Sequence, residues 1–464
     1  MPALLQGLTL SLTMRALDQP HRRARRLQAR ARRRSSVKVL QSHPGHFSPA
    51  RVTPVNVYEE ARKAPLWEQA FYTIWLFSIF LPIDAFQPIR YLCIVGLLSM
   101  LVLHAKDVLP LMRKAWPIFM LPIFVAFSLG WTLYPGAGTK TVLLVLLTPT
   151  LLVVLASRLR AAEFLRLIMI AGWFGTLYCI PFYATFAAGG PYAQKNIFAF
   201  HMMIVIVLSM GAVLNEEEHI LLRLIAIAFI PVAFLFQLLA DSATSLVFAV
   251  AGCAVLLAIK LVWGGVSRVR HMRTTMIALF IGAVLTLTLA VLSMPENSMF
   301  DDFLALVGKD STFTGRTAIW NAAEIVSKQH PWIGVGVEGF WNPLTGLAQT
   351  LNENDSKPFG TKLSFHSAFW EVRVHFGYIG LALFLNAMAW SGLRTVGLWL
   401  KEGNLVNSTL LVMYIVIFTS CFTESYATGT TNMMVYFFYF GGLAAFQHGE
   451  RKFLGVARLV ERPA

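Results

Sequence analysis

The residues with the clearest chemical potential lie in and beside one polar interval, Met294 to Phe365, of an otherwise apolar chain. Arg316 stands near the start of a predicted amphipathic helix for which Thr314 is the expected N-cap. Free backbone N–H groups, the positive end of the helix dipole and a guanidinium would meet there, which suits a phosphate. The alternative is an arginine paired with a loop acid such as Asp310.

His366 opens the apolar run that follows this interval. The helix dipole disfavours the charged form of a histidine at a helix N-terminus, so we expect a neutral imidazole that can accept a proton. Glu371 and Arg373 follow within two turns. The pattern makes His366 a candidate general base for a hydroxyl. The alternative is an interfacial histidine that only caps its helix.

Three glycines, Gly334, Gly336 and Gly339, stand next to aromatic residues and predict a tight turn. Their spacing is not that of a P-loop, because no Lys-Ser or Lys-Thr follows the last glycine. It is not a dinucleotide fingerprint either, because no strand–helix–strand context surrounds it.

The elements that must position these residues are membrane helices. Of the 464 residues 56% are hydrophobic and only 14% are charged, against about 25% charged residues in soluble domains. Apolar runs of about 20 residues can cross a bilayer, so the sequence predicts an all-α polytopic membrane protein with about twelve transmembrane helices. The expected spans are 67–83, 88–105, 115–134, 139–157, 163–186, 195–214, 219–240, 242–263, 273–293, 366–390, 406–424 and 431–448.

Lysine and arginine alternate between the two sides of these spans as the positive-inside rule requires. With a cytoplasmic N-terminus, the short outer loops carry only Arg90, Lys140 and Lys195. Both termini are then cytoplasmic, and the large loop 294–365, between the ninth and tenth spans, is periplasmic. The net charge of +15 reads as a topology signal and contact with anionic lipid, not as nucleic-acid binding.

This topology divides the chain into five parts. Residues 67–293 carry spans one to nine, 294–365 the loop with the catalytic motifs, 366–448 spans ten to twelve, and 449–464 a basic cytoplasmic tail. Residues 1–66 are interpreted as a basic, disordered cytoplasmic tail on anionic lipid. A start codon further downstream is the main alternative for that segment, and a nucleic-acid role is a weaker one.

The same topology gathers scattered polar residues on the outer side. Lys195-Asn196 opens the sixth span, Asp241-Ser242 separates the seventh and eighth, His366 opens the tenth and Glu424 ends the eleventh. Charged residues near spans are costly and mark function. We therefore expect a site at the outer membrane surface.

Taken together, several short sequence segments resemble the O-antigen ligase and polymerase superfamily of bacterial envelope enzymes, in particular exopolysaccharide polymerases of the ExoQ type. The resemblance covers about residues 190–385. The residues that carry it are Lys195-Asn196, Asp241 to Leu246, Thr314 to Trp320, Pro331 to Gly336 with Phe340-Trp341, and His366 with Glu371 and Gly377 to Gly380. One departure is Ser367, where the family commonly has asparagine.

The resemblance implies a glycosyltransferase similar to the GT-C class. Its donor would be an oligosaccharide on undecaprenyl pyrophosphate and its acceptor a sugar hydroxyl, on a lipid-linked glycan or on lipid A-core. Arg316 would hold the pyrophosphate with Lys195 as a second basic contact, and His366 would be the base. Glu371 and Asp241 would orient or support the site. Further expected substrate contacts are Asn196, Ser242, Thr317, Trp320 and Arg373.

A pyrophosphate is already a good leaving group, so the reaction needs mainly charge stabilisation and a positioned base. We expect no cofactor and no metal. The preferred function is polymerisation of repeat units into exopolysaccharide or O-antigen in the bacterial inner membrane, with other polysaccharide assembly proteins as possible partners. The alternatives are an O-antigen ligase, transfer of glycan to protein, and a flippase or transporter, although no internal repeat supports the last.

Overall fold

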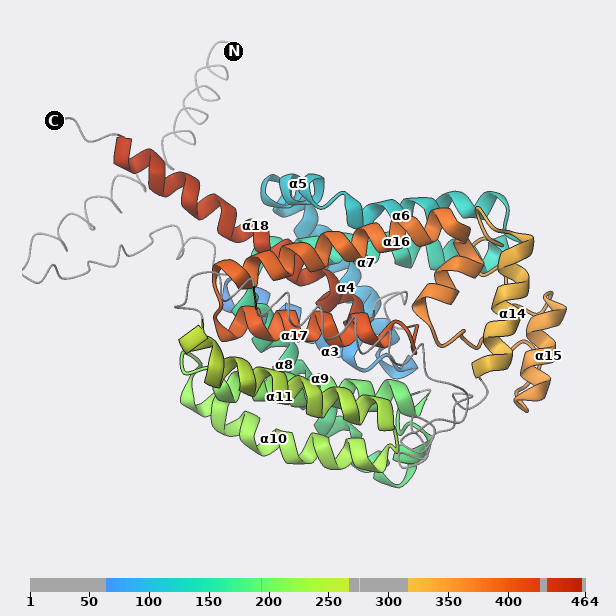
Figure 1. Ribbon diagram of the computed structural model, residues 1–464, viewed down its shortest axis with the longest axis horizontal. Coiled ribbons are helices and arrows are strands. Elements are labelled where there is room, and N and C mark those ends of the chain that lie inside the picture. Colours follow the sequence, from blue (N-terminus) through green and yellow to red (C-terminus); the bar gives the residue numbers. More distant parts are fainter. Residues whose placement is uncertain (1–63, 193, 267–274, 276–315, 426–431, 461–464) are drawn as a thin grey trace, which may run out of the picture. The chain divides into compact units, whose positions relative to one another are not determined.

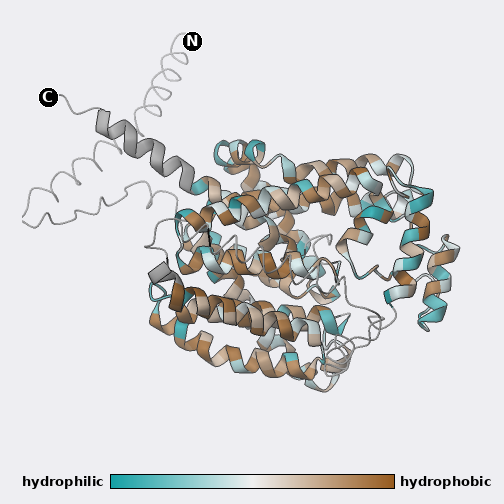
Figure 2. Ribbon diagram, in the orientation of Figure 1, coloured by the Kyte–Doolittle hydropathy of each residue, from teal (hydrophilic) through white to brown (hydrophobic). Residues whose placement is uncertain are grey.

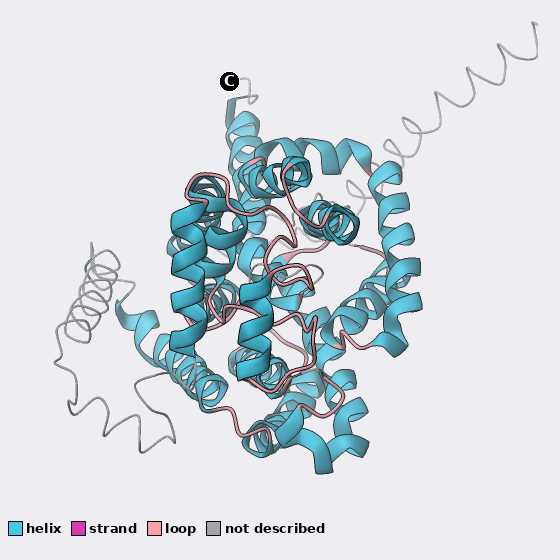
Figure 3. Cartoon of the chain, turned by 90° about the vertical axis from the view of Figure 1, so that its right-hand side faces the viewer, coloured by secondary structure: helices cyan, strands magenta, loops and turns pink. Residues whose placement is uncertain are grey.

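The computed structural model describes residues 64–192, 194–266, 275, 316–425 and 432–460, and the statements below concern these residues. They form helices joined by turns and loops, with no strand in this part of the chain (Figure 3). The expectation of an all-helical protein is confirmed.

Most of the helices coincide with apolar runs of the sequence, and Figure 1 shows their arrangement. Their bounds are α3 Leu66–Phe80, α4 Gln87–Leu103, α5 Ala105–Lys114, α6 Pro117–Phe127, α7 Pro135–Arg158, α8 Ala161–Cys179, α9 Lys195–Leu214, α10 Ile220–Leu239, α11 Ala243–Val266, α14 Arg316–Gln329, α15 Gly346–Asn354, α16 Ala368–Lys401, α17 Leu405–Ser420 and α18 Met433–Val460. Except for Thr275, the expected ninth span lies outside the described residues.

Seven of the described helices are long and apolar enough to cross a membrane, and the bent pair α5 and α6 would make an eighth crossing. Helix α10 is apolar around most of its surface and leaves much of it exposed (Figure 2). Such a surface finds no favourable partner in water and suits lipid. The chain is a multi-pass membrane protein, and the count of about twelve spans stays a prediction.

Helix α9 forms the centre of the helical packing. It contacts α8, α10, α11 and α17, and most of its side chains are buried. Its first residues, Lys195 and Asn196, are therefore positioned by a helix that packs against four others.

Among the elements that differ from the sequence-based expectation are α5, α16 and also α18, which continues to Val460 and not to residue 448. Residues 106–114 were expected to be a basic inner loop but form α5, which makes an angle of 84° with α6. The physical reason is amphipathicity, because Val108 and Leu111 are buried while Lys106, Arg113 and Lys114 remain exposed. The tenth span was expected to end at residue 390, whereas α16 continues to Lys401.

Helix α16 is interrupted at Gly377, whose φ of 63° and ψ of −162° are not helical. The polar loop packs into this break. The N–H groups of Val335 and Gly336 donate to the carbonyls of Val374 and His375 at 3.0 and 2.8 Å. Beyond the break, the N–H groups of residues 378 and 379 donate to the carbonyls of residues 331 and 332 at 2.8 and 3.1 Å.

We call this pairing of residues 331–336 with 374–379 the backbone clasp. It gives hydrogen-bond partners to main-chain groups that a broken membrane helix would otherwise leave unpaired. A Cβ on Gly334 would collide with the main chain of His375, and one on Gly377 with the main chain of Trp332. Both glycines have positive φ, so the two chains approach this closely only because side chains are absent.

A second set of bonds ties the same loop to α6 and α7. The hydroxyl of Thr132 donates to the Val337 carbonyl at 2.6 Å, and the Val337 N–H donates to the Ser128 hydroxyl at 3.0 Å. Thr141 of α7 donates to the Glu338 carboxylate at 2.6 Å. The described part of the loop is thus bonded both to α16 and to the neighbouring α6–α7 region.

Candidate active site

The carboxylate of Glu424 is the centre of the candidate site. It follows α17, and only 3% of its side chain is exposed. Its Oε1 atom accepts hydrogen bonds from Arg316 Nη2 at 2.9 Å and from Asn196 Nδ2 at 3.2 Å. Its Oε2 atom lies 3.4 Å from His366 Nδ1. One buried acid therefore joins the beginnings of α9, α14 and α16 to the end of α17.

Main-chain bonds fix Glu424 in this place. Its N–H donates to the Ser420 carbonyl at 2.7 Å, which continues the turn at the end of α17. The N–H of Ala368, at the start of α16, donates to the carbonyls of Cys421 and Glu424 at 2.9 and 3.1 Å. These bonds satisfy a donor that a helix start leaves open, and they set the distance between His366 and the acid.

The network continues through Asn196 towards the turn between α10 and α11. The Ser242 hydroxyl donates to Asn196 Oδ1 at 3.1 Å. Next to it, Lys195 Nζ lies 3.2 Å from Asp241 Oδ2. Both charged side chains of that pair are exposed, by 41% and 85%, and such pairs contribute little free energy. An anion that binds here can therefore replace Asp241 as the partner of Lys195 at a low cost in free energy.

His366 has a φ of 48°, an unfavourable value for a residue other than glycine. Glu371 stabilises this conformation through Phe365, the residue before His366. The Oε2 atom of Glu371 accepts a hydrogen bond from the Phe365 N–H at 3.0 Å. The same oxygen accepts from the Ser425 hydroxyl at 3.4 Å. Glu371 thus contacts the neighbours of both His366 and Glu424 and acts here as a positioning residue.

Helix α14 packs onto the same turn. Ala323 and Val326 are buried against the aromatic residues that surround Phe365, with Ile319 partly buried beside them, which confirms the amphipathic helix expected here. Trp320 Nε1 donates to the Phe365 carbonyl at 2.8 Å. The expected N-cap, Thr314, and the alternative partner of Arg316, Asp310, lie outside the described residues.

The remaining expected contacts are placed differently. Thr317 is exposed on α14. The guanidinium of Arg373 stacks on the rings of Trp370 and Tyr378 and donates to the Tyr378 hydroxyl at 2.9 Å. These contacts do not include the Glu424 carboxylate, so Arg373 is not part of the network that Glu424 forms.

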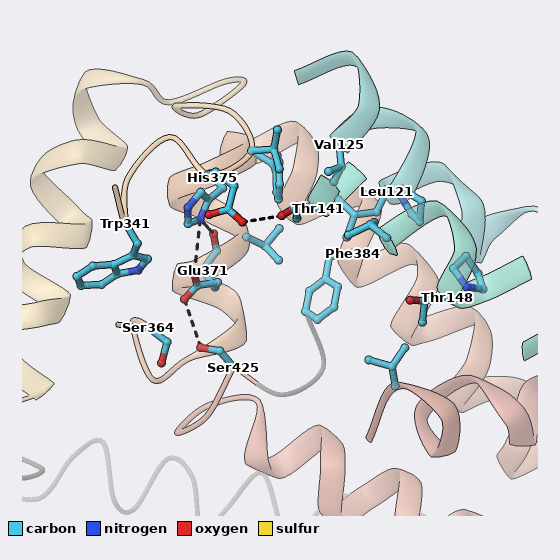
Figure 4. Close-up of a pocket in the computed structure, with 18 of the residues that line it drawn as sticks. Leu121, Val125, Thr141, Thr148, Trp341, Ser364, Glu371, His375, Phe384 and Ser425 are labelled. Atoms are coloured by element: carbon cyan, nitrogen blue, oxygen red, sulfur yellow. Dashed lines mark hydrogen bonds and ion pairs between the residues drawn. The ribbon is translucent and has the colours of Figure 1, made fainter. Parts of the chain in front are cut away.

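A cavity of about 360 Å³ adjoins the network and is lined by α6, α7, α16, α18 and the polar loop (Figure 4). Glu371 and Ser425 belong to its wall. Glu371 accepts hydrogen bonds from Phe365, the neighbour of His366, and from Ser425, the neighbour of Glu424. The cavity and the network therefore share one wall.

The arrangement supports acid–base chemistry beside an anion site. When the Nδ1–H of a histidine donates to a carboxylate, Nε2 is left with a lone pair that can accept a proton. Arg316 uses one nitrogen for Glu424, and a guanidinium has five N–H donors in all. Donors therefore remain with which this side chain can bind an anion.

The sequence analysis placed Glu424 among the outer polar residues but did not predict its contacts with Arg316, Asn196 and His366. The signal available was an acid at the end of an apolar run, 406–424, where charge is costly. Its three partners come from segments between 58 and 228 residues away, so only the folded chain shows that one carboxylate serves all of them.

Comparison with known proteins agrees with this geometry. Residues 224–385 match the family model described as O-antigen ligase. The exopolysaccharide production protein ExoQ of Rhizobium meliloti is 28% identical over 275 residues, which cover 57% of this chain and 62% of that protein.

The chain therefore resembles the O-antigen ligase and polymerase superfamily, and it covers less than two thirds of the length of ExoQ. The expected resemblance is thereby confirmed. The family match ends at residue 385, so Glu424 lies beyond it, whereas Arg316, His366 and Glu371 lie within it.

Proposed function

We propose that this protein is a bacterial inner-membrane glycosyltransferase that polymerises undecaprenyl-pyrophosphate-linked oligosaccharide units at the periplasmic face. The observation that carries the proposal is the convergence of Arg316, His366 and Asn196 on the buried Glu424 carboxylate. A guanidinium for a diphosphate and an oriented imidazole for a hydroxyl are the two groups that this transfer needs.

In the proposed reaction, the acceptor hydroxyl oxygen forms a bond with the anomeric carbon of the donor sugar. The bond from that carbon to the phosphate oxygen breaks, and its electron pair leaves with the diphosphate. His366 Nε2 takes the hydroxyl proton. Arg316 and Lys195 offset the charge of the departing diphosphate, and Glu424 stabilises the imidazolium that forms.

The periplasmic location of the site and the cytoplasmic termini belong to the same proposal. They rest on the distribution of lysine and arginine over the short loops. The lipid-linked donor fits a site at the ends of membrane helices, because its sugar and its diphosphate would then be at the height of Glu424 while its chain stays in the bilayer.

An O-antigen ligase is the second candidate, since the matched family model carries that description. Its chemistry at the donor is the same and only the acceptor differs. The lipid-linked glycans of a deletion strain separate the two functions. Single repeat units on the carrier indicate a lost polymerase, and full-length lipid-linked chains that are missing from lipid A-core indicate a lost ligase.

The site itself is tested with Arg316→Ala and His366→Ala, with Lys328→Ala as the control. Lys328 lies on the same helix as Arg316, and its exposed side chain pairs, among the described residues, with Glu324 at 2.7 Å. We expect both site variants to reach the membrane in normal amounts and to form no polymer, while the control forms it normally. Full polymer formation by both site variants would refute the assignment.

A further inference from the structure

Helix α16 is longer than a membrane span needs to be. Its 34 residues would measure about 51 Å at 1.5 Å per residue, against roughly 30 Å for the hydrocarbon core of a bilayer. Residues 376–393 contain no charged residue and no histidine, and they measure about 27 Å. The charged residues and histidines on either side of this interval are Glu371, Arg373, His375, Arg394 and Lys401. The part that fits the core therefore begins at the break around Gly377.

The exposed surface of α16 changes at the same place. None of residues 368–377 is exposed. Beyond the break, exposed side chains recur at helical spacing along one stripe, and apart from Asn386 they are apolar. They are Tyr378, Ile379, Ala382, Leu385, Ala389 and Leu393. An exposed apolar stripe on a helix of this length suits contact with lipid.

The polar loop adds two exposed apolar side chains to the outer end of this stripe. Trp332 is 68% exposed, and Ile333 next to it is exposed as well. The backbone clasp holds them in place, because the N–H of Ile379 donates to the Trp332 carbonyl at 3.1 Å. The rings of Trp332 and Tyr378 lie 6.1 Å apart, edge to face. We call Trp332, Ile333, Tyr378 and Ile379 the clasp patch.

The segment between α6 and α7 carries similar residues close to the clasp. Its Thr132 donates to the carbonyl of Val337, the residue that follows the clasp. On either side of Thr132, Leu133 is exposed, and Trp131 is half-buried. Tryptophan and tyrosine are enriched where a membrane meets water, because their rings are apolar and their edges are polar. Aromatic and aliphatic side chains from three segments thus surround the start of the stripe.

A cation lies on the polar side of the clasp patch. The guanidinium of Arg373 is 4.9 Å from the centre of the Tyr378 ring, and it donates to the Tyr378 hydroxyl at 2.9 Å. Arginines near the ends of membrane helices place their apolar stem on apolar surface and keep the charge among the headgroups. The order from Arg373 through Tyr378 to the stripe is therefore the order in which polarity falls across a membrane boundary.

We propose that the clasp patch is a membrane anchor whose four side chains enter the boundary between the headgroups and the hydrocarbon of a lipid bilayer. Lipid fits better than a glycan chain, because the isoleucines flank the two rings and the patch continues into the apolar stripe. The hydrocarbon then begins at the break in α16, where main-chain groups have no water and need the bonds of the clasp. Under the function proposed above this leaflet is the periplasmic one, but the anchor does not depend on that function.

Spin labels on introduced cysteines measure the depth of chosen positions in the full-length protein in lipid nanodiscs. Ile333→Cys and Ile379→Cys test the clasp patch. Leu385→Cys is the deep control, six residues further along the same stripe or about 9 Å at 1.5 Å per residue. Phe359→Cys is the water control, because this side chain is 75% exposed on the same polar loop. The unchanged protein, treated in the same way, gives the background of its four cysteines.

Molecular oxygen concentrates in hydrocarbon and a nickel chelate stays in water, so the ratio of their effects on a label reports depth. We expect the oxygen-to-nickel ratio to be lowest at position 359, intermediate at 333 and 379, and highest at 385. Ratios at 333 and 379 equal to that at 359 would overturn the proposal, and so would ratios equal to that at 385, which would move the boundary away from the break.

The glycan alternative has its own readout in the same samples. Protection of the label at position 333 from nickel by a soluble oligosaccharide, without a gain in oxygen access, would assign the clasp patch to glycan binding and overturn the proposal. No change on addition of the oligosaccharide is the expected result. These measurements involve no turnover, so their outcome is separate from the test of Arg316 and His366 by polymer formation.

Discussion

Glu424 Oε2 lies 3.4 Å from His366 Nδ1, and the other oxygen of the same carboxylate accepts from Arg316 at 2.9 Å. The acid thereby orients the candidate base and holds the candidate anion ligand at a fixed distance from it. A carboxylate that is 3% exposed keeps both contacts in a largely water-free place, where electrostatic interactions are strong.

Glu424→Gln should reduce turnover of a lipid-linked donor by about 10²-fold or more, the lower part of the range for loss of general base catalysis. The amide keeps the shape and a hydrogen-bond acceptor but loses the charge that stabilises a protonated His366. Turnover in purified membranes measures the effect, and amounts of protein in the membrane control for folding. Activity equal to that of the unchanged protein would show that the acid is not needed.

Glu424→Ala should also lower stability, because it leaves Arg316 without the acid in a site where only 14% of its side chain is exposed. Breaking a buried pair by removing one partner costs about 3–5 kcal/mol, and partial solvent access places this pair at or below the lower limit. The melting temperature in detergent reports the loss. Removing both partners in Glu424→Ala with Arg316→Met should recover part of it.

The exposed pair Lys195 and Asp241 predicts opposite effects of its two members on donor affinity. Lys195→Ala should raise the KM for the donor by up to about tenfold. This fold-change corresponds to the loss of about 1.4 kcal/mol, roughly the contribution of one charge-assisted hydrogen bond. Asp241→Ala frees the ammonium and should leave that KM unchanged or lower it. Equal increases in both variants would instead assign the pair a structural role only.

Gly377→Ala should impair the enzyme strongly, because the added methyl group meets the main chain of Trp332 in the backbone clasp. Gly397→Ala is the matched control in the same helix, since nothing lies within 4 Å of a Cβ there. We expect a lower melting temperature and loss of turnover for the first variant only. The two variants behaving alike would mean that the break in α16 does not depend on the glycine.

The contact between Glu338 and Lys362 predicts a stability loss at acidic pH. Burial alone raises the pKa of Glu338, but the hydrogen bonds from Lys362 and Thr141 outweigh it and hold the pKa below its usual value. A carboxyl with a lowered folded-state pKa stabilises the protein above its unfolded pKa of about 4.3, and this stabilisation is lost as the pH falls through the folded value.

The melting temperature of the unchanged protein should therefore fall more steeply below about pH 4.3 than that of Glu338→Gln. Glu324→Gln serves as the control on the surface, because Glu324 is exposed beside Lys328. The same slope in the unchanged protein and in Glu338→Gln would contradict the assigned contact.

Much of the fold follows from the sequence because each apolar run carries its own evidence of a helix. The runs near residues 195–214 and 219–240 became α9 and α10 almost without a shift. The amphipathic stripe of α14 was readable for the same reason, namely its period. Short polar segments such as Lys195-Asn196 indicated the site, because placing polar and charged side chains next to a membrane span costs free energy.

The contacts within the site were less accessible to the sequence. The sequence around Glu371 does not indicate whether its carboxylate contacts an imidazole or a main-chain N–H. In the structure the carboxylate accepts a hydrogen bond from the N–H of Phe365. Arg373 is only two residues away in the same helix, yet its guanidinium stacks on the rings of Trp370 and Tyr378. Such choices depend on the direction of each side chain on its helix and on segments distant in the chain.

The backbone clasp also limits how the site can open. Residues 331–336 are bonded to both sides of the break at Gly377, and Val337 and Glu338 are bonded to the α6–α7 region. This part of the loop can therefore not swing away as a flap without breaking several main-chain bonds at once. We therefore expect access for a bulky glycan from the opposite side, where, among the described residues, the exposed Lys195–Asp241 pair can separate at low cost.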